Sequence, residues 1–355
     1  MIIDKTYLSQ KLKQLKDIVP KGAMLGPEGI LVNGNTMIAD SPEIAVCAIL
    51  NTESDDRFIL PVKAIDYINS LPSGDVTITG DDSAVTVKSK SGKCKFNTVG
   101  VDLFVQYNRF SLPNGTDYFF NAATLFSRLS KVLFASNPAS TNVSAQGVNV
   151  ESDGINLNMV AMDGYRCAWA QVESEMDAQA IIPAGAVRKA LSLGMVGNIT
   201  MTVDKDKVVF TSEEYQLATK RINTSYIDYQ KVFNINPEVT VGVNAKEMAE
   251  TLARTNIICN GFPAPVLIVC EDGTEDLQVI CKTSFADFSE TVPVQRESVG
   301  KLRFAANGKY LLDALKQFGD EDVFLCWQSE LSPVTISNEL LKTLVLPVRL
   351  KNDIL

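Results

Sequence analysis

The pattern of apolar and polar residues between Phe119 and Ala135 predicts the end of a strand followed by an amphipathic helix. Asn121 is a favourable N-cap, because its side-chain oxygen can accept a hydrogen bond from an unpaired N–H of the first helical turn. Apolar residues then recur at helical spacing on one face, namely Leu125, Leu129 and Val132. A helix this short is unstable alone in water, so we expect it to pack on the rest of the chain.

The same pattern occurs three times along the sequence. An apolar residue precedes an Asp or Asn, and further apolar residues follow four and eight positions after that cap. The copies are Ile3, Asp4, Leu8 and Leu12; Phe120, Asn121, Leu125 and Leu129; and Val243, Asn244, Met248 and Leu252. The caps lie 117 and 123 residues apart. This spacing predicts an internal triplication.

Two further markers repeat with nearly the same period. A second helix is expected after Pro61, Pro183 and Asn307, with starts 122 and 124 residues apart. Proline suits this position because it loses no hydrogen bond at a helix start. The segment 104–110 is similar to the segment 226–232, again 122 residues later. The agreement of three markers supports the triplication.

Short alternating segments fill the rest of each repeat and predict β-strands. Their connections are too short for parallel crossovers, so we expect mostly antiparallel pairing. The predicted fold class is therefore α+β, with three repeated domains that each pack two helices on antiparallel sheets. We place the domains at residues 1–114, 115–236 and 237–355, since the joining segments carry Pro, Asn and Gly.

Composition limits the class of protein. A chain of 355 residues with 46% hydrophobic residues suits several packed domains. The seven cysteines are scattered without a CxxC pair, which favours free thiols in a reducing cytoplasm. The N-terminus has no secretion signal, and there is no apolar run of about 18 residues that would span a membrane. We therefore expect a cytoplasmic protein. We also expect no metal and no cofactor, because the chain lacks histidine and paired cysteines.

The predicted helices are positively charged, although the whole chain is negatively charged. The net charge is −9 and the pI is near 4.8, which does not favour nucleic acid as a partner. The six repeated helices, however, contain twelve basic and five acidic residues, a net charge of +7. Lysine and arginine are ordinary helix formers, so one basic helix means little. If all six helices share a side, they form a basic surface that binds phosphate backbones weakly and without sequence preference.

No catalytic constellation is present in the sequence. The absence of histidine removes the commonest general base and every histidine-based triad. Asn307-Gly308-Lys309 lacks the upstream glycine and the Ser or Thr of a phosphate-binding loop. Asp163-Gly164 is typical of a hairpin turn, which leaves the neighbouring Tyr165 and Arg166 unexplained. We therefore expect a protein that is not an enzyme.

Several motifs resemble those of one family, the bacterial sliding clamp or beta subunit of DNA polymerase III. Residues 160–168, VAMDGYRCA, resemble that family's signature VATDGHRLA. Residues 226–232, YIDYQKV, resemble its FPDYRRV, and residues 344–350, LVLPVRL, resemble its closing VVMPMRL. The resemblance covers the whole chain in order, with matching domain lengths.

The resemblance implies a head-to-tail homodimeric ring whose six domains line a hole with helices and place sheets outside. Such a ring would encircle double-stranded DNA without reading its sequence and act as a processivity factor for DNA polymerase III. The side chains expected to face DNA are Lys11, Lys13, Lys16, Lys21, Arg128, Lys131, Arg188, Lys189, Arg254, Lys309 and Lys316. At the dimer interface, position matching places Phe96 opposite Ile257 and Ile258.

The family also has a pocket between its second and third domains for QLxLF-like peptides of polymerases, the clamp loader and repair proteins. A mostly apolar groove with a few polar groups suits such a ligand. Carried over by position, the pocket comprises Met162, Gly164, Tyr165, Arg166, Cys167, Ile227, Lys231, Val232, Phe262, Asn307, Tyr310, Leu344, Val345, Leu346, Pro347, Val348 and Arg349.

Some positions depart from the family pattern. Ala145 stands where the family usually has Leu, Met162 where it has Thr, Ile227 where it has Pro and Lys231 where it has Arg. These changes predict an altered peptide preference. Residues 351–355 follow the point at which such chains usually stop, and we expect them to start beside the pocket.

Two other classes of protein remain from the residues alone. One is a triplicated β-rich scaffold or cell-surface protein that uses the repeats for protein contacts only. The missing secretion signal, the lone cysteines and the basic helices speak against it. The other is an enzyme, which the sequence supports least.

Overall fold

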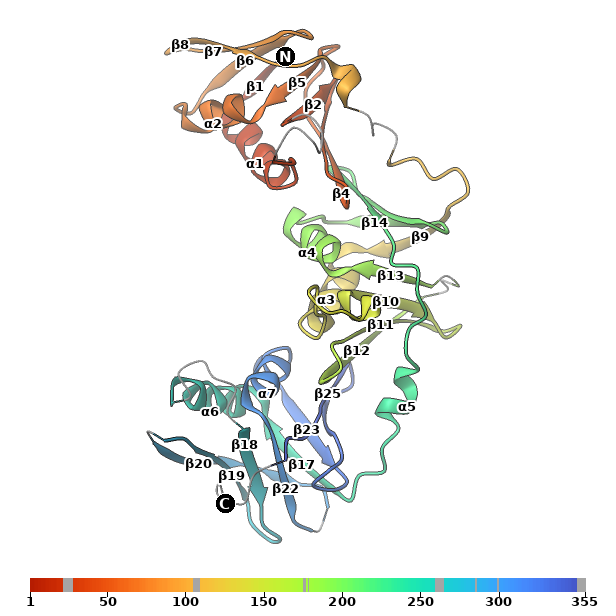
Figure 1. The fold of residues 1–355 in the computed structure, drawn as a ribbon, viewed down its shortest axis with the longest axis vertical. Helices are drawn as coiled ribbons and strands as arrows, with labels where there is room; N and C mark the ends of the chain where they lie inside the picture. The colour runs from red at the N-terminus through yellow and green to blue at the C-terminus, as the bar shows by residue number, and fades with distance from the viewer. Residues whose placement is uncertain are drawn as a thin grey trace. The chain divides into compact units, whose positions relative to one another are not determined.

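The alternating segments of the sequence form antiparallel β-strands in the computed structural model (Figure 1), which confirms the predicted pairing. The structure describes residues 1–21, 28–104, 109–174, 177, 179–258, 265–284, 286–298 and 300–349. The chain divides into two compact units. Unit 1 contains residues 1–126 and 185–223, and unit 2 contains residues 127–184 and 224–355.

Unit 1 holds two antiparallel sheets. The smaller sheet has the order β1-β6-β7-β8, formed by Ile2–Asp4, Asp75–Gly80, Ala84–Ser89 and Gly92–Asn97. The larger has the order β5-β2-β3-β4-β16-β15-β14-β9, formed by Arg57–Pro61, Gly29–Asn33, Thr36–Asp40, Ile44–Ile49, Tyr215–Lys220, Lys207–Thr211, Asn198–Val203 and Thr116–Asn121. The helices α1 (Lys5–Lys16) and α2 (Val62–Ser70) pack on each other in this unit.

Unit 2 also holds two antiparallel sheets. The larger has the order β13-β10-β11-β12-β25-β24-β23-β17-β21, formed by Ala180–Pro183, Gly147–Ser152, Asn156–Met162, Arg166–Glu173, Leu341–Val345, Val334–Ser337, Asp322–Trp327, Val239–Asn244 and Gln295–Arg296. The smaller has the order β20-β19-β18-β22, formed by Asp287–Pro293, Asp276–Lys282, Pro265–Cys270 and Leu302–Asn307. The helices α6 (Ala245–Ile258) and α7 (Gly308–Leu315) pack on each other.

The strand–Asx–helix pattern is confirmed in all three copies. Asp4 accepts a hydrogen bond from the backbone N–H of Tyr7 and caps α1. Asn121 accepts from the N–H of Thr124 at the start of α3 (Ala122–Leu133), and Asn244 caps α6. The stripe residues of all three helices are buried, with exposed fractions of 0–1% for Leu8, Leu12, Leu125, Leu129, Met248 and Leu252. Burial of these side chains holds each helix on its sheet.

The second helix of each copy is also present. It follows Pro61 as α2, Pro183 as α4 (Ala184–Leu193) and Asn307 as α7. Pro61 is the last residue of β5 and the N-cap of α2, and it makes no side-chain capping bond. One further helix, α5 (Tyr229–Phe233), is capped by Asp228 and was not expected from the sequence. No helix in the described part of the chain is long and apolar enough to cross a membrane.

Sheets run continuously from one repeat to the next within each unit. In unit 1, β4 pairs with β16, so that Ala48 faces Tyr215. In unit 2, β12 pairs with β25, so that Ala170 faces Leu341. The strands β8 and β20 each lie at the end of a four-stranded sheet. The three-domain boundaries remain a prediction, because the two compact units divide the middle repeat between them.

Candidate functional site

A tight turn between β11 and β12 presents the first part of the candidate peptide site. The carboxylate of Asp163 accepts hydrogen bonds from the backbone N–H groups of Tyr165 and Arg166, at 2.9 and 3.1 Å. Gly164 has a φ of +91°, a conformation that strongly favours glycine. The turn therefore leaves Tyr165 61% exposed and directs Arg166 into β12.

Arg166 joins this turn to helix α7. Its Nε lies 3.0 Å from Asp163, and its terminal nitrogen lies 2.7 Å from Asp313 of α7. Its guanidinium stacks 4.6 Å from the ring centre of Tyr310 and 5.3 Å from that of Phe134. Burial, followed by the carboxylate of Asp163, raises the pKa of Tyr310. These contacts hold the cation in one orientation beside two aromatic rings.

An apolar cluster lies beneath the β12–β25 pair. Val160, Cys167, Tyr229 and Leu344 are buried together, and Met162 and Val232 pack against them. Burial raises the pKa of the Cys167 thiol to about 12, so this cysteine stays protonated at neutral pH. The cluster gives the surface above it a rigid support.

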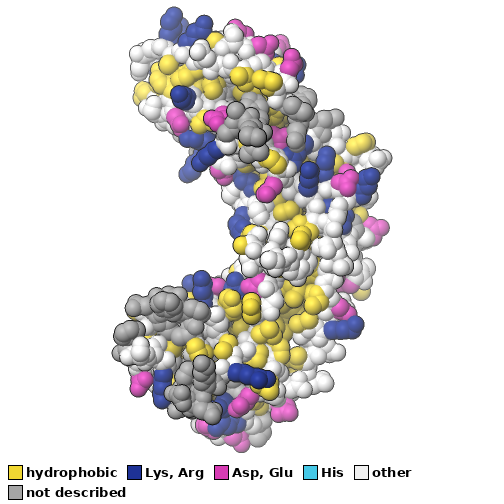
Figure 2. Space-filling model, in the orientation of Figure 1, with side chains coloured by type: hydrophobic (Ala, Val, Ile, Leu, Met, Phe, Trp, Pro, Cys, Tyr) yellow, Lys and Arg dark blue, Asp and Glu magenta, His cyan; other side chains and the backbone are white. Residues whose placement is uncertain are grey.

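The last described residues of the chain complete this surface. The N–H of Leu346 donates to the carbonyl of Tyr165 at 2.9 Å, and the N–H of Val348 donates to Ala305 at 2.7 Å. These bonds hold the segment after β25 between β12 and β22. Four apolar side chains remain exposed by 38–61%: Tyr165, Ile227, Leu346 and Val348. Figure 2 shows hydrophobic side chains gathered over this part of unit 2.

Other residues that were expected in the pocket do not belong to this exposed apolar surface. Asn307 uses its side-chain oxygen to cap α7, and Val345 is fully buried. Lys231 is mostly exposed and pairs with Asp228 at 2.8 Å. Pro347 pairs with Ala306 through an isolated bridge, and Arg349 is exposed. Phe262 lies outside the described residues, as do residues 351–355.

Sequence reasoning missed three side chains that form this site. Asp313 and Phe134 contact Arg166, and the hydroxyl of Tyr226 donates to the carbonyl of Val160 at 3.2 Å. Asp313 follows Tyr310 by three positions on one helix face, which was the available signal. Phe134 offered no signal, because only the fold brings it to Arg166.

The expected DNA-facing residues fall into two groups. Lys11 and Lys189 are 3% and 7% exposed, and their ammonium groups bind Glu214 at 2.6 Å and Asp17 at 2.7 Å. Lys16 and Arg254 also form ion pairs, with Asp66 and Glu290. Within the described residues the other side chains form no ion pair. Lys13, Lys21, Arg188, Lys309 and Lys316 are exposed, and Arg128 and Lys131 are half-buried.

A hollow of about 580 Å³ in unit 1, with both apolar and charged lining residues, contains some of these cations. It lies between the end of α1 and helix α4 and includes Lys21, Arg188 and Lys189, with Asp17 and Glu43. The sequence did not predict that Lys21 and Arg188 line the same hollow, since they are far apart in the chain. Its three basic and two acidic side chains give the hollow a formal net charge of only +1.

The expected interface residues lie on β8 and at the end of α6, which contacts β20. Phe96 is on β8, and its ring lies 5.6 Å from that of Tyr67. Ile257 is 76% exposed and Ile258 is half-buried at the end of α6. Within the described residues, no group of three or more His, Cys, Asp or Glu side chains could hold a metal ion.

Comparisons with known proteins agree on one family. Residues 230–349 match the family model of the DNA polymerase III beta subunit, C-terminal domain. The chain is 23% identical over 333 residues to the Beta sliding clamp of Synechocystis sp., covering 85% of this chain and 84% of that protein. It is 23% identical over 298 residues to the Beta sliding clamp of Pseudomonas aeruginosa, covering 81% and 80%.

Solved structures show the same fold along nearly the whole chain. A Pseudomonas aeruginosa DNA polymerase sliding clamp with ligand has a TM-score of 0.88 at 19% identity, covering 99% of both chains. The DNA polymerase III beta subunit of Thermotoga maritima has a TM-score of 0.86 at 22% identity, again covering 99% of both. The predicted α+β fold with antiparallel sheets is confirmed.

Proposed function

We infer that this chain is a bacterial sliding clamp of the DNA polymerase III beta-subunit type and acts as a DNA replication processivity factor. The observation that carries this inference is the clamp fold over 99% of the chain, with a TM-score of 0.88. The family model at residues 230–349 and the curated clamp relatives support it. The chain acts by binding and tethering, so it is a non-catalytic accessory subunit.

The proposed assembly is a head-to-tail homodimer with three clamp domains per chain, at residues 1–114, 115–236 and 237–355. The ring surrounds duplex DNA, and Lys13, Lys21, Arg188, Lys309 and Lys316 are the exposed cations best able to contact phosphates. Such contacts are weak and independent of sequence, which permits sliding. Retention comes from the closed ring and not from affinity.

The exposed apolar surface of Tyr165, Ile227, Leu346 and Val348 is the proposed docking site for partner peptides. Leu and Phe anchors of a QLxLF-like motif would cover these side chains, and Arg166 would bind polar groups of the peptide. The partners are DNA polymerase III, other polymerases, repair proteins and the clamp loader, in the cytoplasm. The Arg166→Ala, Tyr310→Ala and Leu346→Ala variants should each weaken binding of a QLxLF peptide by about tenfold or more, measured by fluorescence polarisation. Unchanged affinity would remove that residue from the site.

The internal repeat predicts how the ring closes. Ala48 and Ala170 occupy equivalent positions, because each comes three residues after the pair that closes its hairpin. The equivalent residue in the third repeat is Glu290 of β20, three residues after Asp287. Its expected partner is Gly92. Gly92 is the first residue after the turn between β7 and β8, just as Tyr215, the partner of Ala48, is the first residue after the turn between β15 and β16.

This register places Phe288 of one subunit opposite Cys94 of the other. It also places Asp287 opposite Lys95, an attractive pair. The backbone bond from Ile49 N–H to Glu214 shows which pairs of the β4–β16 junction are hydrogen-bonded. By equivalence, Phe288 and Cys94 form a non-hydrogen-bonded pair, whose Cα atoms lie about 4.5 Å apart. That distance is within the range of a disulfide.

A crosslink tests this closure. The Phe288→Cys variant should form a covalent dimer with the native Cys94 under mild oxidation, seen on a non-reducing gel. Ser289→Cys is the matched control, because its side chain is expected to face Lys93 on the opposite side of the sheet. Equal crosslinking of both variants would refute the register, as would a dimer in light scattering that Phe288→Cys does not crosslink.

Retention on DNA tests the function. With a clamp loader present, the protein should stay on nicked circular DNA and leave linear DNA by sliding off its ends. The Phe288→Cys dimer, oxidised after loading, should remain on the circle in high salt. A monomer in solution with no retention on circular DNA would contradict the inference and favour a scaffold that contacts only proteins.

A further inference from the structure

One position on the first strand of each repeat differs sharply in the third copy. In the first two copies this position carries the exposed side chains of Ile2 and Phe119, which face Thr77 and Thr200 across the strand pair. In the third copy the position is Gly242, and its partner is Phe324. In the third repeat the large exposed side chain, Phe324, therefore lies on the neighbouring strand β23 and not on the first strand of the repeat.

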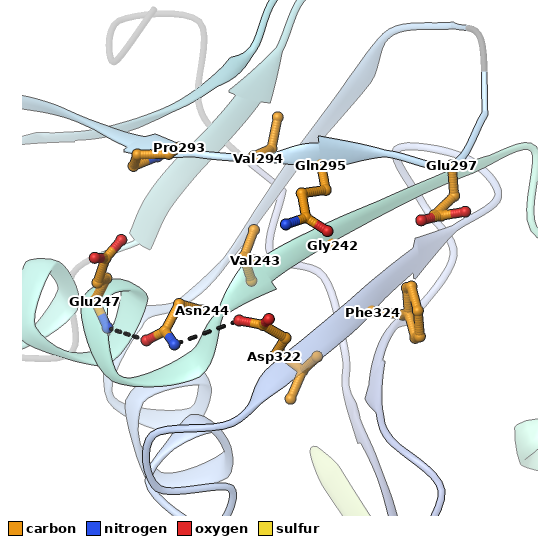
Figure 3. Close-up of a pocket in the computed structure, with 11 residues that line it drawn as sticks. Gly242, Val243, Asn244, Glu247, Pro293, Val294, Gln295, Glu297, Asp322 and Phe324 are labelled. Atoms are coloured by element: carbon orange, nitrogen blue, oxygen red, sulfur yellow. Dashed lines mark hydrogen bonds between the residues drawn. The ribbon is translucent and has the colours of Figure 1, made fainter.

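This exchange leaves a hollow in unit 2 of about 270 Å³ (Figure 3). Gly242 forms part of its floor, and Phe324, which is 45% exposed, forms one wall. The segment from Pro293 to Gln295 forms the opposite wall. A Cβ atom at position 242 would lie 3.4 Å from the backbone oxygen of Gln295 and 4.0 Å from the Phe324 ring. Both distances are ordinary van der Waals contacts, so an alanine would fit here, whereas a side chain as large as Ile2 or Phe119 would fill the hollow.

The walls of the hollow are acidic. Glu247, Glu297 and Asp322 line it, and none of its described lining residues is Lys or Arg. The start of α6 also lies here, but Asn244 already accepts from the N–H groups of Lys246 and Glu247. The helix start is thus occupied by its own cap and does not provide an anion site. Carboxylates around an exposed aromatic ring instead suit a cation with a flat face.

We propose that this hollow is a docking site for an arginine side chain of a partner protein. The guanidinium stacks on the ring of Phe324 and binds Glu297, while the aliphatic part of the arginine covers Gly242. The volume fits one long side chain and is small for a drug-sized ligand. The site lies on β17, β21 and β23, apart from the peptide surface on β12 and β25, and it does not depend on ring closure.

The probe is N-acetyl-L-arginine amide, titrated into the full chain while the valine methyl signals of Val243, Val294 and Val323 are followed by NMR. N-acetyl-L-citrulline amide is the matched probe, because it has the same shape without the charge. We expect saturable shifts of these methyls with the arginine probe, at least fivefold weaker binding of citrulline, and weaker binding at high salt.

Two variants locate the probe. Phe324→Ala and Glu297→Gln should each weaken binding about threefold to fivefold, through loss of the stacked ring and of the charge. Phe119→Ala is the matched control, since it removes an exposed aromatic from the equivalent strand of the second repeat. Equal binding of the two probes, or unchanged binding in both hollow variants, would overturn the proposal. Loss of DNA retention would bear only on the clamp function.

Discussion

The contact between Arg166 and Asp313 ties the turn at Asp163 to helix α7, and its removal should destabilise unit 2. The two side chains are 147 positions apart in sequence, and their atoms are 2.7 Å apart in the fold. Arg166 is 13% exposed, Asp163 is 7% exposed and Asp313 is 29% exposed. Asp313→Asn removes the more accessible of the two negative charges, while Arg166→Met removes the cation that both share.

The exposed fractions determine the expected sizes. Fully exposed pairs contribute about 0–1 kcal/mol, whereas removing one partner of a buried pair costs about 3–5 kcal/mol. Asp313 is partly screened by water, so Asp313→Asn should cost about 1 kcal/mol. Arg166→Met should cost about 2–3 kcal/mol, because it leaves Asp163 nearly buried without its cation. The double variant should cost about 1 kcal/mol less than the sum, since the shared contact is counted twice.

Tryptophan fluorescence is a selective assay for this effect. The chain has two tryptophans, Trp169 and Trp327, and both belong to unit 2. Urea unfolding followed by their emission therefore reports on unit 2. Asp320→Asn is the control, because it breaks an exposed ion pair with Lys246 in the same unit and should change the free energy of unfolding by less than about 0.5 kcal/mol. Additive losses for Arg166→Met and Asp313→Asn, within about 0.5 kcal/mol, would refute the coupling.

Four further substitutions test one ion pair and the packing. Burial is the largest influence on Lys11 and lowers its pKa, but the hydrogen bond and charge of Glu214 and the contacts with Tyr215 together outweigh it and leave the pKa raised. The contribution of Lys11 to stability should therefore be complete below about pH 10.5 and be lost as the pH rises further. Lys11→Met should remove that part of the pH dependence, measured as the difference in Tm from the wild type between about pH 9 and about pH 11. Leu129→Ala should lower the free energy of unfolding by about 2–5 kcal/mol, because the side chain is 1% exposed; a loss below about 1 kcal/mol would contradict its place in the core. Gly147→Ala should lower Tm, since its Cβ would lie 2.6 Å from a backbone oxygen of the adjacent strand. Gly185→Ala in α4 should leave Tm unchanged or raise it slightly, because its Cβ would make only an ordinary contact, 4.0 Å from a side-chain atom of Ile44.

Local features of the fold could be predicted from the sequence. The caps at Asp4, Asn121 and Asn244 and the buried stripes behind them depend on residues within two helical turns, so their spacing is visible in the chain. Short helix α5 was missed, because its five residues make too short a pattern. The turn at Asp163 was also predictable, since an Asp-Gly pair favours it locally.

The candidate site was predicted only where its residues are close in sequence. The motif around Arg166 and the segment around Leu346 were identified, and the register of β12 and β25 then brings them together. The partners Asp313 and Phe134 were missed, because no local pattern marks which helix will reach Arg166. The same limit applies to the helix charges, where Lys11 and Lys189 form ion pairs with Glu214 and Asp17.

The sequence by itself determined the triplication, the capped helices and the antiparallel class of the fold, because each follows from hydrophobic spacing and capping over a few residues. Tertiary structure alone decided which charges are exposed, which aromatic rings surround Arg166, and where the third repeat opens a hollow at Gly242. These features join residues that lie far apart in the chain. Their energies depend on distance and burial, and both quantities exist only after the strands have paired.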